Sequence, residues 1–142
     1  MFICSKFQKD CSKPFNNCID SMNLKKLHWF SQHELTNGQI ATLQCVGITS
    51  HEKHTIIFND NIVEQIEEVT KCKVIGIVAP INYALKLLRS GFKIIEFVNI
   101  PSARQRGKFL CKGLNIHTLN ESYFVPCPIP IEEQEEGDLN YK

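Results

Sequence analysis

Hydrophobic and polar residues follow two different periods along this chain, and each change of period marks the start of a new element. The first patterned segment, residues 25–31 (KKLHWFS), has the apolar character of a short strand. Thr36 and Gln39 then stand at the spacing of a capping box, and apolar residues follow at helical intervals until Gly47. This pattern predicts a helix that begins at Thr36 and ends at Gly47.

The succession of strands and helices continues to residue 100. Three β-rich segments follow, at residues 48–58, 73–79 and 92–100, separated by amphipathic segments that begin after Asn59 or Asp60 and after Pro80. The β-branched run KVIGIVA at 73–79 is typical of a central parallel strand that is buried on both faces. Strands that alternate with helices in this way predict a single Rossmann-like α/β domain, with a mostly parallel sheet and flanking helices.

The two ends of the chain differ from the patterned middle. Residues 1–21 show neither period and are expected to be an N-terminal extension, so the α/β domain should cover residues 22–130. Residues 122–131 (SYFVPCPIPI) are expected to form at most an edge strand, because their alternate prolines lack amide donors. The acid-rich residues 131–142 are expected to be a solvated tail.

The composition fits one folded domain. The 142 residues are 43% hydrophobic and 22% charged, with a formal net charge of +1. This balance does not indicate general disorder. Nucleic-acid binders that depend on bulk electrostatics usually have a strongly basic surface, whereas the positive charge here is local, at Arg104, Arg106, Lys108 and Lys112. We see no segment with the length and apolar character of a membrane span and no secretory signal before the 7 cysteines. We therefore expect a cytoplasmic protein with reduced thiols and no membrane contact.

Cysteine and histidine spacings do not predict a metal site. Cys4, Cys11 and Cys18 stand seven residues apart, whereas structural zinc sites bring their ligands in close pairs. His51 and His54 form the only close pair of histidines, and we interpret them as exposed loop residues. No metal and no other cofactor is expected. The chain also lacks a Walker P-loop, a G-x-G-x-x-G and a G-x-S-x-G motif, which removes the main support for ATPase, dinucleotide or serine-hydrolase chemistry.

Candidate site residues follow from the expected sheet. In an open parallel sheet, ligands bind at the carboxyl ends of the strands, where the strand order reverses. Three segments should reach that edge, namely residues 31–36, 80–83 and 101–108. The residues expected to act on or touch a ligand there are Ser31, Gln32, His33, Thr36, Asn82, Ser102, Arg104, Arg106, Gly107 and Lys108.

These residue types favour a phosphate-bearing ligand. His33 has an ordinary pKa near working pH, and the expected helix N-terminus at Thr36 attracts anions. Asn82 offers an amide to a base edge or a ribose hydroxyl, and the guanidinium groups of Arg104 and Arg106 match phosphate oxygens. The simpler alternatives are loop hydrogen bonds, helix capping and packing, and an exposed basic loop.

The segments HWFSQHELTNGQ and IGIVAPINYALKLLRSGFKIIEFVNIPSARQRG together resemble the small CRISPR-associated proteins of the Csx family, some of which are ring nucleases. The resemblance covers residues 24–113. It implies a dimeric Rossmann-like protein that holds a cyclic oligoadenylate in its strand-end loops. It also implies metal-independent cleavage, in which a 2′-hydroxyl of the ligand attacks the adjacent phosphate. Ser31, His33 and Lys108 would be the catalytic residues, with Ser102 and Arg104 beside them.

Two functions remain in competition. The leading hypothesis is binding of a nucleotide or cyclic oligonucleotide, with metal-independent phosphodiester cleavage as an extension of it. The alternative is a non-catalytic regulatory or interaction module, of a kind that phages encode, whose basic loop docks an acidic partner or nucleic acid. The first hypothesis requires Arg104 and Arg106 to converge with His33 in a concave pocket, and the second leaves them on a convex surface. A homodimer is also expected, because small open sheets often bury an exposed edge or a helix face in this way.

Overall fold

The computed structural model of this chain describes residues 25–31 and 33–138, and within them seven strands form one mixed sheet. The strands are β2 (Lys26–Phe30), β3 (Ser50–Lys53), β4 (Val74–Ile77), β5 (Lys93–Pro101), β6 (Lys108–His117), β7 (Ser122–Pro126) and β8 (Gly137–Asp138). The helices are α2 (Asn37–Cys45), α3 (Ile62–Val69) and α4 (Ile81–Arg89), with a 3-10 turn, η2 (Ile131–Glu133). The expected N-terminal extension, its three cysteines and Gln32 lie outside the described residues.

The sheet has the order β3-β2-β4-β5-β6-β7, and β8 pairs with β6. Strands β3, β2, β4 and β5 run parallel, whereas β6, β7 and β8 join them in antiparallel fashion. The prediction of a single Rossmann-like α/β domain is confirmed. The ten-residue strand β6 was not predicted, because Lys112 and Gly113 interrupt its apolar run.

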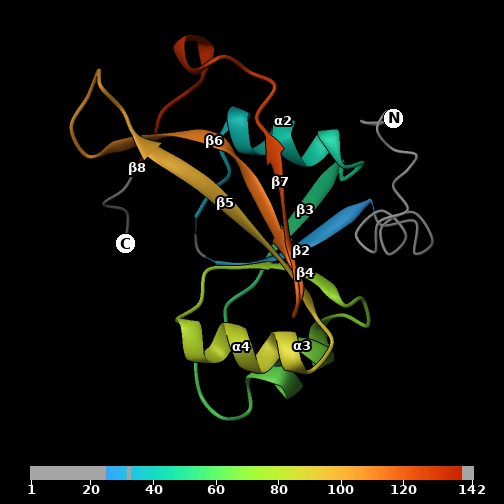
Figure 1. Cartoon of the computed structure of the whole chain (residues 1–142). Helices are drawn as coiled ribbons and strands as arrows, with labels where there is room; N and C mark the ends of the chain where they lie inside the picture. The colour runs from blue at the N-terminus through green and yellow to red at the C-terminus, as the bar shows by residue number, and fades with distance from the viewer. Residues whose placement is uncertain (1–24, 32, 139–142) are drawn as a thin grey trace.

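Helices cover both faces of the sheet, with α2 on one face and α3 and α4 on the other (Figure 1). Right-handed crossovers require this, because β2 to β3 steps in one direction along the sheet and β3 to β4 steps back. The buried cluster that includes α2 consists of Leu27, Leu43, Val46, Ile48, Val74, Ile95, Leu114 and Ile116. The buried cluster that includes α3 and α4 consists of Phe30, Ile62, Ile66, Ile75, Ile77, Leu87, Phe92 and Ile94.

Local signals set the helix ends. The capping box predicted for α2 is present, because the Thr36 amide donates to Gln39 Oε1 (3.0 Å) and the Gln39 amide donates to Thr36 Oγ1 (3.3 Å). The cap predicted for α3 is wrong. Asn61 is the N-cap residue and no side chain caps the helix, while Asn59 Oδ1 instead accepts from the Asn61 amide (2.8 Å).

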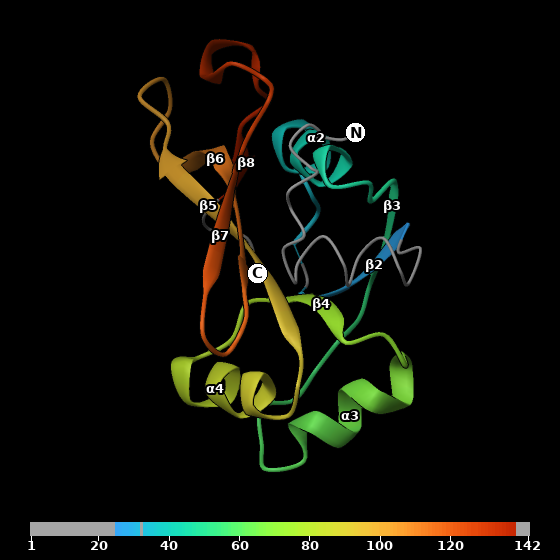
Figure 2. The same cartoon turned by 45° about the vertical axis from the view of Figure 1, so that its right-hand side comes forward.

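Strand β5 pairs with β4 on one side and with β6 on the other, and it is longer than β4. Only Lys93–Ile95 pairs with β4, whereas pairing with β6 continues to Pro101, which faces Phe109. The second half of β5 and the first half of β6 therefore form a two-stranded extension that passes the end of β4 (Figure 2). We call this extension the arm, and residues 102–107 form the loop at its end.

The C-terminal segment folds back onto the arm. Residues 131–138, which were expected to belong to a solvated tail, contain η2 and the short strand β8. Strand β8 pairs with Lys108 and Phe109 at the start of β6, and β7 pairs with β6 from Gly113 onward. The stretch of β6 between these two partners, around Cys111, is bound by the side chain of Gln134.

The two outer strands are short. Strand β3 has four residues, of which Glu52 and Lys53 are exposed. Strand β7, predicted as an edge strand at most, does lie at the opposite edge and ends at Pro126. Among the described residues, no helix combines the length and apolar character that a bilayer crossing requires.

Candidate functional site

A cavity of about 450 Å³ lies at the carboxyl ends of β2 and β4. The chain moves outward from β2 to β3 and then returns to β4 on the other side of β2, so the strand order reverses between β2 and β4. Open α/β sheets bind ligands at such a reversal. The polar residues that line the cavity are His33, Gln39, Glu96, Asn99 and His117, and the aromatic ones are Trp29, Phe97 and Phe109.

Helix α4 begins at this cavity. Val78, Ala79 and Ile81 line it, and Pro80 is the N-cap residue without a side-chain cap. The Tyr83 amide donates to the Pro80 carbonyl (3.0 Å), whereas the two amides before it, those of Ile81 and Asn82, cannot bond within the helix and carry its partial positive charge. An uncapped helix start at the cavity therefore supplies donors for an anionic group, although none of the lining residues is Lys or Arg.

Trp29 forms part of the aromatic wall because Gly76 leaves room for it. Trp29 and Gly76 are direct neighbours in β2 and β4, and a Cβ at position 76 would lie 2.6 Å from Trp29 Cε3. The indole also contacts Phe97 edge-on, with ring centroids 5.5 Å apart. Its Nε1 donates to the His33 carbonyl (3.3 Å), which ties the loop after β2 to the sheet.

His33 is the predicted catalytic residue that the structure does place at the cavity. Its ring stands edge-on to Phe109, with centroids 6.3 Å apart. Burial lowers the pKa of His33 below its ordinary value of 6.5, so the imidazole is largely neutral at neutral pH and able to accept a proton.

A second imidazole at the cavity belongs to a chain of three polar groups. His117 Nε2 lies 2.7 Å from Glu96 Oε1, and His117 Nδ1 lies 2.6 Å from Ser122 Oγ. With Glu96 as acceptor, Nε2 carries the proton and Nδ1 accepts from a hydroxyl group. A carboxylate in this position stabilises the imidazolium that forms when the ring takes a proton. The pair Glu96–His117 is therefore suited to act as a general base.

The sequence did not predict this group of Glu96, His117 and Ser122, because the three residues come from three different strands. Glu96 lies on β5, His117 on β6 and Ser122 on β7. Their proximity depends on the antiparallel register, in which His117 faces Ser122 directly. The alternation of residues along β5 places Glu96 on the face of α4, but no signal in the sequence reveals which residue of β6 stands beside it.

Three other predicted residues, Ser31, Thr36 and Asn82, do not line the cavity. Ser31 Oγ accepts from the His33 amide (3.2 Å), and Thr36 forms the capping box and is 8% exposed. Asn82 is exposed on α4 and is not among the residues that line the cavity.

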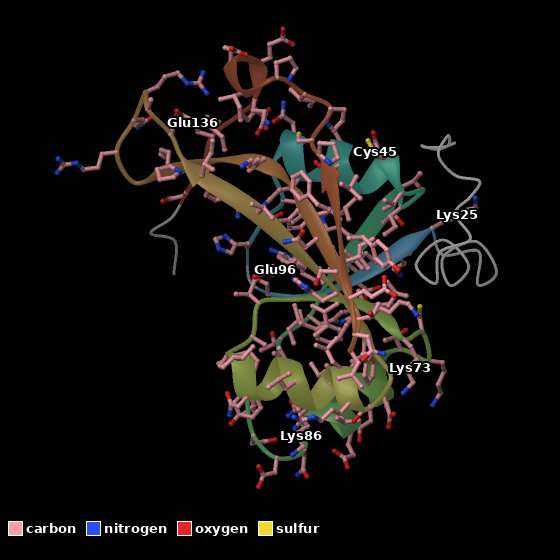
Figure 3. The ribbon with its side chains drawn as sticks, in the orientation of Figure 1. Lys25, Cys45, Lys73, Lys86, Glu96 and Glu136 are labelled. Carbon is pink, nitrogen blue, oxygen red and sulfur yellow. The ribbon has the colours of Figure 1, made fainter. Side chains whose placement is uncertain are left out.

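The basic loop lies at the end of the arm and not at the cavity. Ser102 Oγ donates to Glu136, and Arg104 contacts the same carboxylate through Nε (3.4 Å) and donates to the Gln134 carbonyl through Nη2 (3.3 Å). Arg106 is exposed. Figure 3 shows Glu136 beside the end of the arm and Glu96 near the middle of the molecule.

Gly107 and Lys108 close this loop. Gly107 has a positive φ of 80°, which explains a glycine there, and Lys108 begins β6 opposite Asp138. Of the described residues predicted from the sequence to form the site, the cavity thus includes His33 but not Ser102, Arg104, Arg106, Gly107 or Lys108.

No protein-family model, no curated protein and no solved structure matches this chain. Any function must therefore be argued from the cavity, the arm and the side chains that they present.

Proposed function

We propose that the cavity between β2 and β4 binds a small ligand with a planar ring and an anionic group, and that a nucleotide is this ligand. The observation that supports the proposal is the place and lining of the cavity. It lies at the reversal of strand order, and aromatic and hydrogen-bonding side chains share its wall. Its volume of about 450 Å³ falls within the range of small-molecule sites.

Each part of such a ligand has a suitable partner. A base can stack against aromatic side chains such as Phe97 and Phe109. The amides of Gln39 and Asn99, whose Nε2 and Oδ1 atoms lie 3.4 Å apart, can hydrogen bond its edge. The uncapped start of α4 suits the phosphate. The volume accommodates one nucleotide unit, so a cyclic oligonucleotide would place one unit inside the cavity and the others outside.

Cleavage of a cyclic oligoadenylate is the narrower form of this proposal. The 2′-hydroxyl of the ligand would displace the Ser122 hydroxyl from His117 Nδ1, while Glu96 holds the ring through Nε2. It would give its proton to Nδ1 as its oxygen forms a bond to the adjacent phosphorus. The bond from phosphorus to the 5′-oxygen breaks, and that oxygen takes a proton from water, because His33 is largely neutral at neutral pH. The products are a 2′,3′-cyclic phosphate and a 5′-hydroxyl, and no metal takes part in the step.

Binding is tested by titrating mononucleotides and cyclic oligoadenylates while following the fluorescence of Trp29, the only tryptophan of the chain. We expect a saturable change that calorimetry confirms. His33→Ala and His117→Ala should each weaken binding about 10- to 100-fold, the usual effect of losing a hydrogen bond to a charged group. His51→Ala, on β3 and outside the cavity, is the matched control. The proposal would be refuted if none of these nucleotides binds, or if His51→Ala weakens binding as much as His33→Ala and His117→Ala do.

Turnover is tested separately by chromatography of the products in the presence of a chelator. Glu96→Gln should reduce the rate more than it reduces affinity, because the carboxylate acts on the imidazolium that forms during the reaction. Binding without products would limit the protein to ligand recognition.

The position of the basic loop favours a second function, docking of a polyanionic partner on the arm. The loop lies at the end of a two-stranded extension, and Arg106 is exposed there. If the arm binds nucleic acid, affinity should fall steeply with salt, and Arg106→Ala should make the slope shallower by about one unit. Lys71→Ala, exposed and distant from the arm in the chain, serves as control. Affinity that does not depend on salt would exclude this mode.

A further inference from the structure

A second group of polar residues, His28, Glu52 and His54, lies on β2 and β3, apart from the cavity. His28 is the direct neighbour of Glu52 in the parallel register, and His54 follows Glu52 by two residues, so its side chain is on the same face. One potential ligand atom from each residue lies within 4.8 Å of the other two. We infer that these three side chains bind a divalent transition-metal ion.

The distances suit a shared ion. His28 Nδ1 lies 2.8 Å from His54 Nε2, and His54 Nε2 lies 3.8 Å from Glu52 Oε2. Two nitrogens that each lie about 2.1 Å from one ion are about 3 Å apart when the nitrogen–metal–nitrogen angle is 90°. They are further apart when that angle is tetrahedral. A small outward rotation of either ring therefore admits the ion between the nitrogens.

The surroundings hold the rings in place. The His54 side chain is 17% exposed and packs between the rings of His28 (centroids 5.0 Å apart) and Phe30 (5.1 Å). Lys26 Nζ binds Glu52 Oε1 at 2.6 Å, which fixes the carboxylate and leaves its other oxygen on the side of His54.

The ligand set indicates the kind of ion. Two imidazoles and one carboxylate suit Zn²⁺, Co²⁺, Ni²⁺ or Cu²⁺, whereas Mg²⁺ and Ca²⁺ prefer oxygen ligands alone. Three protein ligands leave at least one coordination position open. His54 also lines a hollow of about 220 Å³ with Phe30, Ser31 and Thr55, so a water molecule or a small ligand has room beside the ion.

The proposal is tested by titrating the full chain with Co²⁺ in the presence of a reductant that does not bind metals. Visible absorption reports coordination, and a near-ultraviolet charge-transfer band would reveal thiolate ligands. We expect one Co²⁺ per chain without that band. His28→Asn and His54→Asn should each weaken binding by more than about tenfold, while His51→Asn should not. His51 is the control because it lies on the same short strand, next to Glu52.

Two results would overturn the proposal. One is binding that survives both substitutions, and the other is a thiolate band, which would assign the ion to some of the 7 cysteines. Zn²⁺ should also raise the melting temperature of the native chain and not that of the His54→Asn variant, because an ion that binds only the folded state stabilises it. Should a histidine variant fail to fold, Glu52→Gln replaces it, since that side chain is 48% exposed and should not be needed for folding.

Discussion

Replacement of Gln134 by Ala should destabilise the fold strongly, although the residue lies in a segment expected from the sequence to be a solvated tail. The Gln134 side chain is 4% exposed and occupies the gap that β7 and β8 leave along β6. Its Oε1 accepts from the Cys111 amide (2.8 Å), and its Nε2 donates to the carbonyls of Cys111 (2.7 Å) and Ile129 (3.0 Å). The side chain therefore replaces a strand residue as the partner of Cys111.

The expected magnitude follows from the burial of these groups. Gln134→Ala leaves the amide and the carbonyl of Cys111 without partners, and Cys111 is 0% exposed. An unpaired buried polar group costs about 1–3 kcal/mol. For the two groups together, the free energy of unfolding should fall by about 2–6 kcal/mol.

Gln65 offers a matched control with the same chemistry at the surface. Its Oε1 accepts from the Ile57 amide (3.1 Å) and its Nε2 donates to the Ile57 carbonyl (2.7 Å). Ile57 is 66% exposed, so water can replace the lost bonds. Gln65→Ala should therefore change the free energy of unfolding by only about 0.5 kcal/mol.

The assay is urea-induced unfolding under reducing conditions, followed by the fluorescence of Trp29. A lower midpoint with an unchanged slope reports a loss of stability. The reasoning fails if Gln134→Ala and Gln65→Ala have the same effect, or if the Gln134 variant stays within about 0.5 kcal/mol of the native chain.

Three further predictions concern the sheet and its titratable groups. Gly76→Ala should destabilise the fold and shift the emission of Trp29, because its Cβ would lie 2.6 Å from the indole; unchanged emission would contradict this packing. Burial lowers the pKa of His28 below 6.5 in the folded chain, so at acidic pH the unfolded chain binds more protons than the folded chain. The contribution of His28 to the free energy of unfolding should therefore be constant above pH 6.5 and decline below it. His28→Asn should reduce that decline, and an identical pH profile would argue against the shift. Burial also raises the pKa of Cys111 to about 11, so iodoacetamide should label this thiol only after unfolding, as peptide mass spectrometry would show.

Helices and strands that are marked by residues close together in the sequence could be predicted from it. The Thr36–Gln39 capping box depends on residues three positions apart, and KVIGIVA is apolar at almost every position, so both could be recognised without knowledge of the fold. The rule for ligand sites in parallel sheets then placed His33 at a crevice without any contact being known.

Features that depend on strand register could not be predicted. The length of β5 beyond β4 decides that Arg104 lies at the end of the arm and outside the cavity of about 450 Å³ that His33 lines. The parallel register brings His54 to His28 across 26 residues of sequence. From the sequence, His54 was grouped only with His51 and both were interpreted as exposed loop residues, whereas His51 lies on β3 and the His54 side chain is 17% exposed. Register depends on the complete sheet, and no short segment encodes it.

The outer strands of the sheet determine how copies of this chain can approach one another. A strand added beside β3 would pair with only four residues and confront the exposed charges of Glu52 and Lys53. On the opposite side, Pro126 ends β7, and the prolines that follow it at positions 128 and 130 supply no amide donors. Charges, short strands and prolines at sheet margins oppose fibrillar growth. Continuation of the sheet from one copy of the chain to the next is therefore disfavoured at both outer strands.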